Sequence, residues 1–285
     1  MSVSAPDIPA KPKRGFRLDL KTVGPLLALA LLVLLGISLN ENFLSYSNLT
    51  NVLARSSFIG IGATFVITAG GLDLSVGSMA AVIAGVMIMV MNWLIPSMGI
   101  GWGVVIAGMA TGILLGGVAG VFNGTMITRG RIEAFIVTLG TMGIFRSLVT
   151  FLADGGTLSL NFQVADVYRP VYYAGLLGVP WPIIIFALVA IGGEVVMRYT
   201  AFGRYCAAIG SNEQVARYSS INVDNVRLLT YILQGVLVGV AVLLYVPRLG
   251  SASSTTGVLW ELEAIAGVII GGTTLKGGYG RIWGT

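Results

Sequence analysis

The residues best suited to chemistry in this 285-residue chain lie in the segment GGLDLSVGS at residues 70–78. The segment sets one carboxylate, Asp73, between paired glycines and two serines, with apolar runs on both sides. These side chains can hydrogen-bond a polar solute, or they can satisfy the free backbone N–H groups at the start of a helix. Both interpretations, a polar path and a structural hinge or cap, stay open, and both require hydrogen bonding rather than bond making.

The residue inventory excludes most enzymatic chemistry. The chain has no histidine and one cysteine, Cys206, so a His/Cys metal cluster, a histidine-based triad and an intramolecular disulfide are ruled out. Near the end, the segment GVIIGGTTLKGGYGRIWG lacks the G-x-x-x-x-G-K-[ST] pattern of a phosphate-binding loop. We therefore expect no catalytic residues, no metal, no cofactor and no nucleotide hydrolysis by this chain.

Two charged residues fall inside or near apolar runs. Arg146 lies in the middle of TMGIFRSLV, and its partner is left open. Glu194 in IGGEVVMRY is near enough to an end to reach the membrane interface, where it either pairs with an arginine or serves transport. Charges inside a membrane are costly and mark functional sites by default.

The elements that position these residues are predicted to be transmembrane helices. The chain is 55% hydrophobic and only 10% charged, with a mean hydropathy of +0.89, which is typical of an integral membrane protein. About 20 helical residues cross a bilayer. The sequence therefore predicts an all-α polytopic bundle in the lipid bilayer, with spans near 23–39, 52–69, 76–91, 101–123, 132–152, 181–197 and 228–246. The stretch from Leu262 to Gly272 is too short to cross alone and is predicted to be a half-helix or the start of a longer span.

The basic residues indicate the orientation of the spans. Residues 1–22 form a basic tail, and together with the loops that alternate to the same side they hold 13 of the 17 lysines and arginines. The positive-inside rule then predicts a cytoplasmic N-terminus. This distribution also accounts for the net positive charge, so no nucleic-acid partner is expected. The rule places 153–180 outside as the longest external loop and 198–227 inside as the longest internal loop, and these loops are the candidate partner surfaces.

Glycines form a regular stripe on the predicted span 101–123. They recur every four residues, so they lie along one side of the helix, where another backbone can approach closely. Their partner is expected to be a helix of the same chain, with a second subunit as the alternative. The predicted helix-packing residues are Gly108, Gly112, Gly116, Gly120 and Gly124.

The internal loop contains a short predicted helix at 212–220. Ser211 or Asn212 can cap it, and Val215, Ala216 and Tyr218 are expected to form a small apolar edge. Such a helix is offered to a cytosolic partner, or it lies as an amphipathic helix on the inner leaflet.

Three segments in this order resemble a known family: GGLDLSVGS, FGRYCAAIGSNEQVARYSSINV and EAIAGVIIGGTTLKGGYGR. Together they are similar to the permease subunits of bacterial ATP-binding-cassette importers for monosaccharides, over roughly residues 45–285. The resemblance implies a permease dimer, an ATP-binding cassette ATPase on the cytoplasmic face, and a periplasmic or extracellular sugar-binding protein. It implies a multi-pass protein of the bacterial inner membrane that moves a monosaccharide or related polyol.

The resemblance also assigns roles to residues. The segment around 212–220 corresponds to the helix that couples the permease to the ATPase, and Asn123 joins the membrane motif. The predicted substrate-path or hinge residues are Gly70, Gly71, Asp73, Ser75, Gly77, Ser78 and Asn123, of which Asp73, Ser75, Gly77 and Asn123 match the family pattern. The predicted ATPase-coupling residues are Gly203, Arg204, Gly210, Asn212, Glu213, Val215 and Ala216, and all but Val215 match the family pattern.

The chain departs from the family pattern in places. Ser220 stands where the family often has glycine, and Ala134 stands where it often has proline. Family members usually continue for about two more spans, so about eight spans or half-spans of about ten are expected here, and the permease domain 23–285 is expected to be incomplete at its C-terminus. An ion-gradient-coupled secondary sugar transporter is the alternative function, and a non-transporting membrane scaffold is a third.

Overall fold

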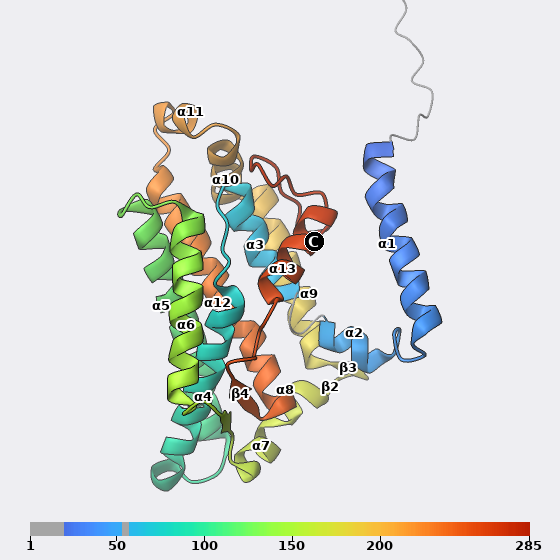
Figure 1. The fold of residues 1–285 in the computed structure, drawn as a ribbon, viewed down its shortest axis with the longest axis vertical. Coiled ribbons are helices and arrows are strands. Elements are labelled where there is room, and N and C mark those ends of the chain that lie inside the picture. Colours follow the sequence, from blue (N-terminus) through green and yellow to red (C-terminus); the bar gives the residue numbers. More distant parts are fainter. Residues whose placement is uncertain (1–19, 53–56) are drawn as a thin grey trace, which may run out of the picture. The chain divides into compact units, whose positions relative to one another are not determined.

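The structure is a computed structural model that describes residues 20–52 and 57–285 (Figure 1). It divides after Leu44 into two units. The first contains helix α1 (Leu20–Leu39), whose 20 residues cover the predicted span 23–39 and whose leucines from Leu27 onward are exposed. Residues 1–19, most of the predicted cytoplasmic tail, lie outside the described residues.

The second unit is a bundle of apolar helices. Within the described part of the chain, five helices are long and apolar enough to cross a membrane, and each contains or closely matches a predicted span. The all-α polytopic prediction is confirmed. These helices are α4 (Val76–Met98), α5 (Trp102–Thr128), α6 (Ala134–Leu152), α9 (Trp181–Tyr199) and α12 (Val223–Leu249).

The structure describes the predicted span 52–69 only in part. Its described part is the end of α2 (Tyr46–Val52) and the 11-residue helix α3 (Phe58–Thr68), and residues 53–56 lie outside the described residues. The eleven described residues of α3 rise about 16 Å along the helix axis. All of its residues are buried, and a short helix is tolerated at membrane depth where protein surrounds it.

A second short helix packs on α3. The stretch expected as a half-helix forms α13 (Trp260–Ile270), again 11 residues long. Ala63 and Ile67 of α3 share a small buried cluster with Val268 of α13. Two short helices therefore lie together inside the bundle. We call them the interrupted helices, because irregular backbone follows α3 at residues 71–75 and turns precede α13 at residues 254–259.

The segments outside the bundle gather at its two ends (Figure 1). The loop 153–180 contains short helices and strands at one end, and its β1 pairs antiparallel with β4 after α12. The loop 198–227 contains two helices at the opposite end. The elements are β1 (Thr157–Ser159), α7 (Phe162–Tyr168), α8 (Pro170–Tyr173), β2 (Gly175–Leu176), β3 (Val179–Pro180), α10 (Ala201–Ser211), α11 (Glu213–Tyr218) and β4 (Ser251–Ser253).

Candidate functional site

The two interrupted helices bring their connecting segments together inside the bundle. Residues 71–75, between α3 and α4, have no regular secondary structure, and residues 254–259 form turns between β4 and α13. Gly77 at the start of α4 meets Gly257 so closely that a Cβ on either residue would overlap the backbone carbonyl of the other. Gly257 also has a φ of +69°, which favours glycine. The two chain segments thus cross backbone to backbone.

A buried polar cluster lies beside this crossing. Ser75 donates to Asp73 Oδ1 from its backbone N–H at 2.9 Å and from its hydroxyl at 2.6 Å. Asn123 of α5 donates from Nδ2 to Ser75 Oγ at 2.9 Å, and the Ser78 hydroxyl donates to the Ser75 carbonyl at 2.8 Å. All four side chains are buried. Asp73 Oδ1 therefore closes a local turn that leads into α4.

Several acceptor oxygens of this region accept no hydrogen bond from the described residues. Asp73 Oδ2 and Asn123 Oδ1 are the two in the cluster, and Gln234 Oε1 and Glu261 Oε2 lie buried on α12 and α13. A buried polar atom left unpaired costs about 1–3 kcal/mol, so such atoms usually have partners. Oxygen acceptors of this kind match the hydroxyl donors of a polar solute.

Arg146 of α6 holds the second crossing segment. Its Nη1 donates to the carbonyl oxygens of Ser254 at 2.5 Å and Thr256 at 2.6 Å. The partners of this arginine are therefore backbone carbonyls far along the chain, which no local sequence pattern indicates. Glu194 instead forms an ion pair one turn away, with Arg198 Nε at 3.1 Å from its Oε1.

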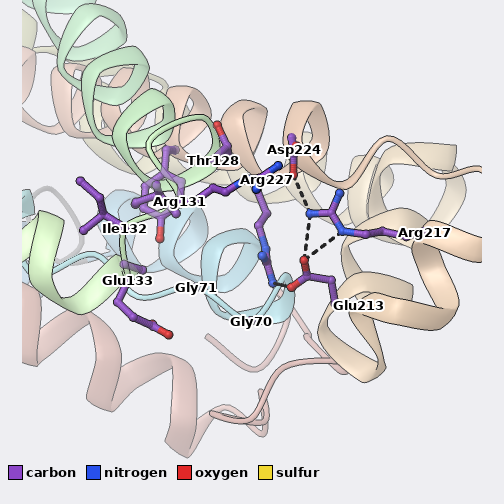
Figure 2. A pocket seen from close by; sticks show the side chains of 13 residues that line it. Gly70, Gly71, Thr128, Arg131, Ile132, Glu133, Glu213, Arg217, Asp224 and Arg227 are labelled. Atoms are coloured by element: carbon purple, nitrogen blue, oxygen red, sulfur yellow. Dashed lines mark hydrogen bonds and ion pairs between the residues drawn. The ribbon is translucent and has the colours of Figure 1, made fainter.

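A polar cavity of about 660 Å³ opens at the end of the bundle that carries α10 and α11 (Figure 2). The paired glycines of the interrupted segment, Gly70 and Gly71, form one wall, and the charged residues of the 198–227 loop form another. The remaining wall comes from the α5–α6 connection. Its lining residues are Gly70, Gly71, Ile127, Thr128, Arg131, Ile132, Glu133, Ala134, Glu213, Arg217, Asp224, Arg227 and Tyr231.

Ion pairs organise this cavity. Glu213 binds two arginines, with Oε1 at 2.9 Å from Arg217 Nη2 and Oε2 at 2.8 Å from Arg227 Nη2. Arg217 also reaches Asp224 Oδ1 at 2.7 Å. Burial by itself would raise the pKa of Glu213, but the hydrogen bonds and charges of Arg217 and Arg227 outweigh it and lower the pKa. The hydrogen bonds that Arg217 donates to Asp224 and Glu213 raise the pKa of Arg217.

The residues implied for coupling lie in α10 and α11. Asn212 Oδ1 accepts from the Val215 N–H at 3.1 Å and caps α11. Ala216 is buried, whereas Val215 and Tyr218 are exposed, so the expected single apolar edge is split between two faces of the helix. Val215 and Tyr218 are three positions apart and therefore share a face of the helix, whereas Ala216 lies on another face.

The other coupling residues of α10 differ in exposure. Gly203 is buried and Arg204 is exposed. Gly210 packs so tightly that a Cβ would overlap the Thr68 carbonyl. Burial raises the pKa of Cys206 to about 12, which makes this thiol unreactive.

The glycine stripe of α5 packs on two helices of the same chain. A Cβ at Gly108 would meet the Met91 side chain, and Gly112 lies beside Met87, both on α4. Gly116, Gly120 and Gly124 face α12.

Sequence reasoning missed three residues of the α12 helix that face the interrupted segment. Arg227 Nε donates to the Ala69 carbonyl at 3.4 Å, and the Tyr231 hydroxyl donates to the Leu72 carbonyl at 3.2 Å. Gln234 Nε2 donates to the Ile59 carbonyl at 3.4 Å. Their spacing of three to four residues places them along one side of α12. A stripe of polar residues along one side of an otherwise apolar helix is the sequence pattern that could have predicted them.

The helices and their buried polar cluster are those of a polytopic membrane protein, in which two connecting segments cross backbone to backbone and a charged cavity lies at one end. The family model described as "Branched-chain amino acid transport system / permease component" matches residues 45–285, and the chain belongs to this family. It is a multi-pass inner-membrane permease subunit of an ATP-binding-cassette importer and is not itself an enzyme.

Curated relatives agree with this assignment. The ribose import permease protein RbsC of Haemophilus influenzae is 35% identical over 263 residues, covering 91% of this chain and 79% of the relative. RbsC of Bacillus subtilis is 38% identical over 276 residues, covering 93% and 81%. The D-allose transport system permease protein AlsC of Escherichia coli is 34% identical over 274 residues, covering 94% and 81%. No solved structure matches the chain.

Proposed function

We propose that this permease imports a monosaccharide or a related polyol. The observation that carries the proposal is that relatives named for ribose and D-allose reach 34–38% identity over more than nine-tenths of the chain. A more distant relative, the xylose transport system permease protein XylH of E. coli, is 30% identical. The free acceptor oxygens of Asp73 and Asn123 support the proposal, because a sugar presents several hydroxyl donors.

The path in this proposal runs past the crossing of the interrupted helices. Gly70, Gly71 and Gly77 provide the hinge, and the polar cluster of Asp73, Ser75, Ser78 and Asn123 receives sugar hydroxyls when the crossing opens. Secondary transporters bind polar substrates at paired breaks in helices, and the proposal applies the same physical arrangement to this importer. The cavity of about 660 Å³ is the cytoplasmic exit of this path.

Energy enters from the cytoplasmic side. A separate cassette ATPase docks on α10 and α11, through the region of Gly203, Arg204, Gly210, Asn212, Glu213, Val215 and Ala216, and its closure tilts the spans so that access alternates. An external sugar-binding protein delivers substrate to the opposite end, near loop 153–180. A second copy of the permease completes the pore, and the N-terminus lies in the cytoplasm.

Reconstitution into liposomes tests the proposal. The permease, a partner cassette ATPase and a sugar-binding protein are combined, and uptake of radiolabelled ribose, allose and xylose is measured with and without internal ATP. We expect uptake of one or more sugars that requires ATP and both partners. Uptake driven by a proton or sodium gradient without the ATPase would replace this function with secondary transport. Absence of sugar uptake under every condition would reject the sugar assignment.

A further inference from the structure

One arginine of α12 connects the cytoplasmic helix α11 with the end of the interrupted helix α3. Arg227 Nη2 lies 2.8 Å from Glu213 Oε2 at the first residue of α11, and its Nε donates to the Ala69 carbonyl at 3.4 Å. Ala69 is the residue that follows the last turn of α3. Figure 2 shows the Arg227 side chain passing between the Gly70–Gly71 turn and Glu213. A single rigid guanidinium thus touches both elements.

The charge of Arg227 suits this position. The last carbonyls of a helix carry partial negative charge, and a cation near them is stabilising. The side chain is 24% exposed, so its ion pair is screened less by water than a fully exposed pair. The bond between Arg227 and Glu213 is also charge-assisted, which makes it stronger than a neutral hydrogen bond.

Backbone contacts make the same junction stiff. A Cβ at Gly210, near the end of α10, would overlap the Thr68 carbonyl at the end of α3. The Gly278 N–H donates to that carbonyl at 2.9 Å. At Gly277, where φ is +82°, a Cβ would lie 3.0 Å from Gly210 Cα and 3.1 Å from Gly70 Cα. Three segments therefore meet through direct backbone contacts, with no side chains between them. Because such close packing is rigid, a displacement of α10 and α11 is expected to move the end of α3 as well.

Arg217 provides the contrast. It binds the same carboxylate, with Nη2 2.9 Å from Glu213 Oε1, and it also binds Asp224. All of these partners belong to the cytoplasmic loop or the first turn of α12, and its hydrogen bonds reach no atom of the interrupted segment. Arg217 holds the loop together, whereas Arg227 joins the loop to the membrane break.

We infer that Arg227 is a positioning residue for transport, which passes the movement of α11 to the interrupted helix through Glu213 and the Ala69 carbonyl. The inference rests on the proposed function, in which a partner ATPase pushes on α11. When α11 shifts, Glu213 pulls the guanidinium, and the guanidinium pulls the end of α3. The Gly70–Gly71 turn, which lies between α3 and the Asp73 cluster, then moves with it.

The experiment measures sugar uptake and ATP hydrolysis together in liposomes that contain the permease, its cassette ATPase and the binding protein. In Arg227→Gln we expect ATP hydrolysis to continue while the uptake per ATP falls by roughly fivefold or more, the lower end of common coupling strengths. The matched control is Arg217→Gln, which removes the other arginine on Glu213, and its uptake per ATP should stay within about twofold of the wild-type value.

A double-mutant comparison separates transmission from loop stability. Glu213→Gln should lower the uptake per ATP as Arg227→Gln does, and the double variant should be no worse than Arg227→Gln alone, because both substitutions break one connection. If Arg227→Gln does not fold, Glu213→Gln against Arg217→Gln carries the test. An unchanged ratio in Arg227→Gln, or an equal loss in Arg217→Gln, would overturn the inference. Failure of the proposed function is distinct, because the wild-type protein would then show no ATP-dependent uptake.

Discussion

The two carboxylate oxygens of Asp73 have different roles. Oδ1 accepts the N–H and the hydroxyl of Ser75 and so shapes the entry to α4, whereas Oδ2 accepts no bond from the described residues. The cap and the path interpretations of this residue therefore concern different atoms. Substitutions can separate them, because asparagine keeps one acceptor oxygen and replaces the other with a donor.

We predict that Asp73→Ala destabilises the protein more than Asp73→Asn does. Alanine leaves the buried Ser75 donors without their acceptor, at a cost of about 1–3 kcal/mol, whereas asparagine retains an oxygen for them. Asp73→Asn should still lower ATP-driven sugar uptake by roughly tenfold, because the free acceptor becomes a donor. Thermal unfolding in detergent, followed by tryptophan fluorescence, checks the first expectation, and liposome uptake checks the second. Equal midpoints for both variants would show that Oδ1 does not support the turn.

The ion pairs of Glu213 predict that the 198–227 loop is sensitive to acid. Its pKa is lowered in the folded protein, so the carboxylate contributes stability above its ordinary pKa of 4.5, and this contribution is lost as the pH falls through the lower folded value. The side chain is 37% exposed, so the effect is modest.

We predict that limited proteolysis of the 198–227 loop stays constant between pH 7 and 5 and accelerates below about pH 4.5. In Glu213→Gln the ion pairs are absent at every pH, so cleavage should be faster at neutral pH and should change less on acidification. Gel analysis of the fragments over time provides the measurement. A variant with the same pH profile as the wild-type protein would assign the acid sensitivity to another group.

At the scale of elements, α5 and α12 approach each other backbone to backbone. A Cβ at Gly116 would overlap the Gly235 carbonyl, and a Cβ at Gly235 would overlap the Gly116 carbonyl. The two helices therefore pack through reciprocal glycines. In a bilayer, where no hydrophobic effect drives helices together, such close packing supplies much of the attraction.

Neighbouring glycines on α5 offer a matched comparison. We predict that Gly116→Ala lowers the unfolding midpoint, because overpacking costs about 1–3 kcal/mol. Gly117→Ala should be neutral or slightly stabilising, since its Cβ would lie 3.7 Å from Val236 Cγ2, an ordinary contact, and alanine gains about 1 kcal/mol in a helix. Thermal unfolding of both variants in the same detergent tests this. A destabilised Gly117→Ala beside an unaffected Gly116→Ala would contradict the packing.

The long helices could be predicted from the sequence, but the structure of the segments that connect them could not. Hydropathy over about 20 residues finds α4, α5, α6, α9 and α12 because each satisfies the bilayer requirement by itself. The same rule cannot tell that the described helix α3 is buried along its whole length and is followed by the irregular segment 71–75. The surrounding helices that permit such irregular backbone are invisible to a hydropathy window.

The candidate site also contains residues that could be predicted from the sequence and residues that could not. The motif at 70–78 was visible because polar residues interrupt an apolar run. Arg227 was visible only as one of several basic residues in the loop 198–227, since its contacts with Glu213 and Ala69 join residues 14 and 158 positions away. The partners of Arg146 were equally hidden, because backbone carbonyls carry no residue signature.

At the scale of the whole molecule, the two ends of the bundle have different chemistry. One end carries α10, α11 and the charged cavity, together with Arg129, Arg198 and Arg204, and the other carries the β1–β4 pair with α7 and α8 (Figure 1). A positively charged end is retained in the cytoplasm during insertion. This asymmetry supports an orientation with α11 inside and loop 153–180 outside, which in turn decides where the ATPase and the binding protein dock.

Cysteine labelling tests that orientation directly. Cys206 is the only cysteine in the chain and is buried, so Cys206→Ser gives a background without thiols. Leu177 in the predicted external loop is 96% exposed and Tyr218 in α11 is 87% exposed, so a cysteine at either position is accessible to reagent. We predict that a membrane-impermeant maleimide labels Leu177→Cys in intact spheroplasts and labels Tyr218→Cys only after the membrane is permeabilised. The reverse pattern would place α11 outside the cell, where no ATP-driven partner can reach it, and would remove the physical basis for coupling through Arg227.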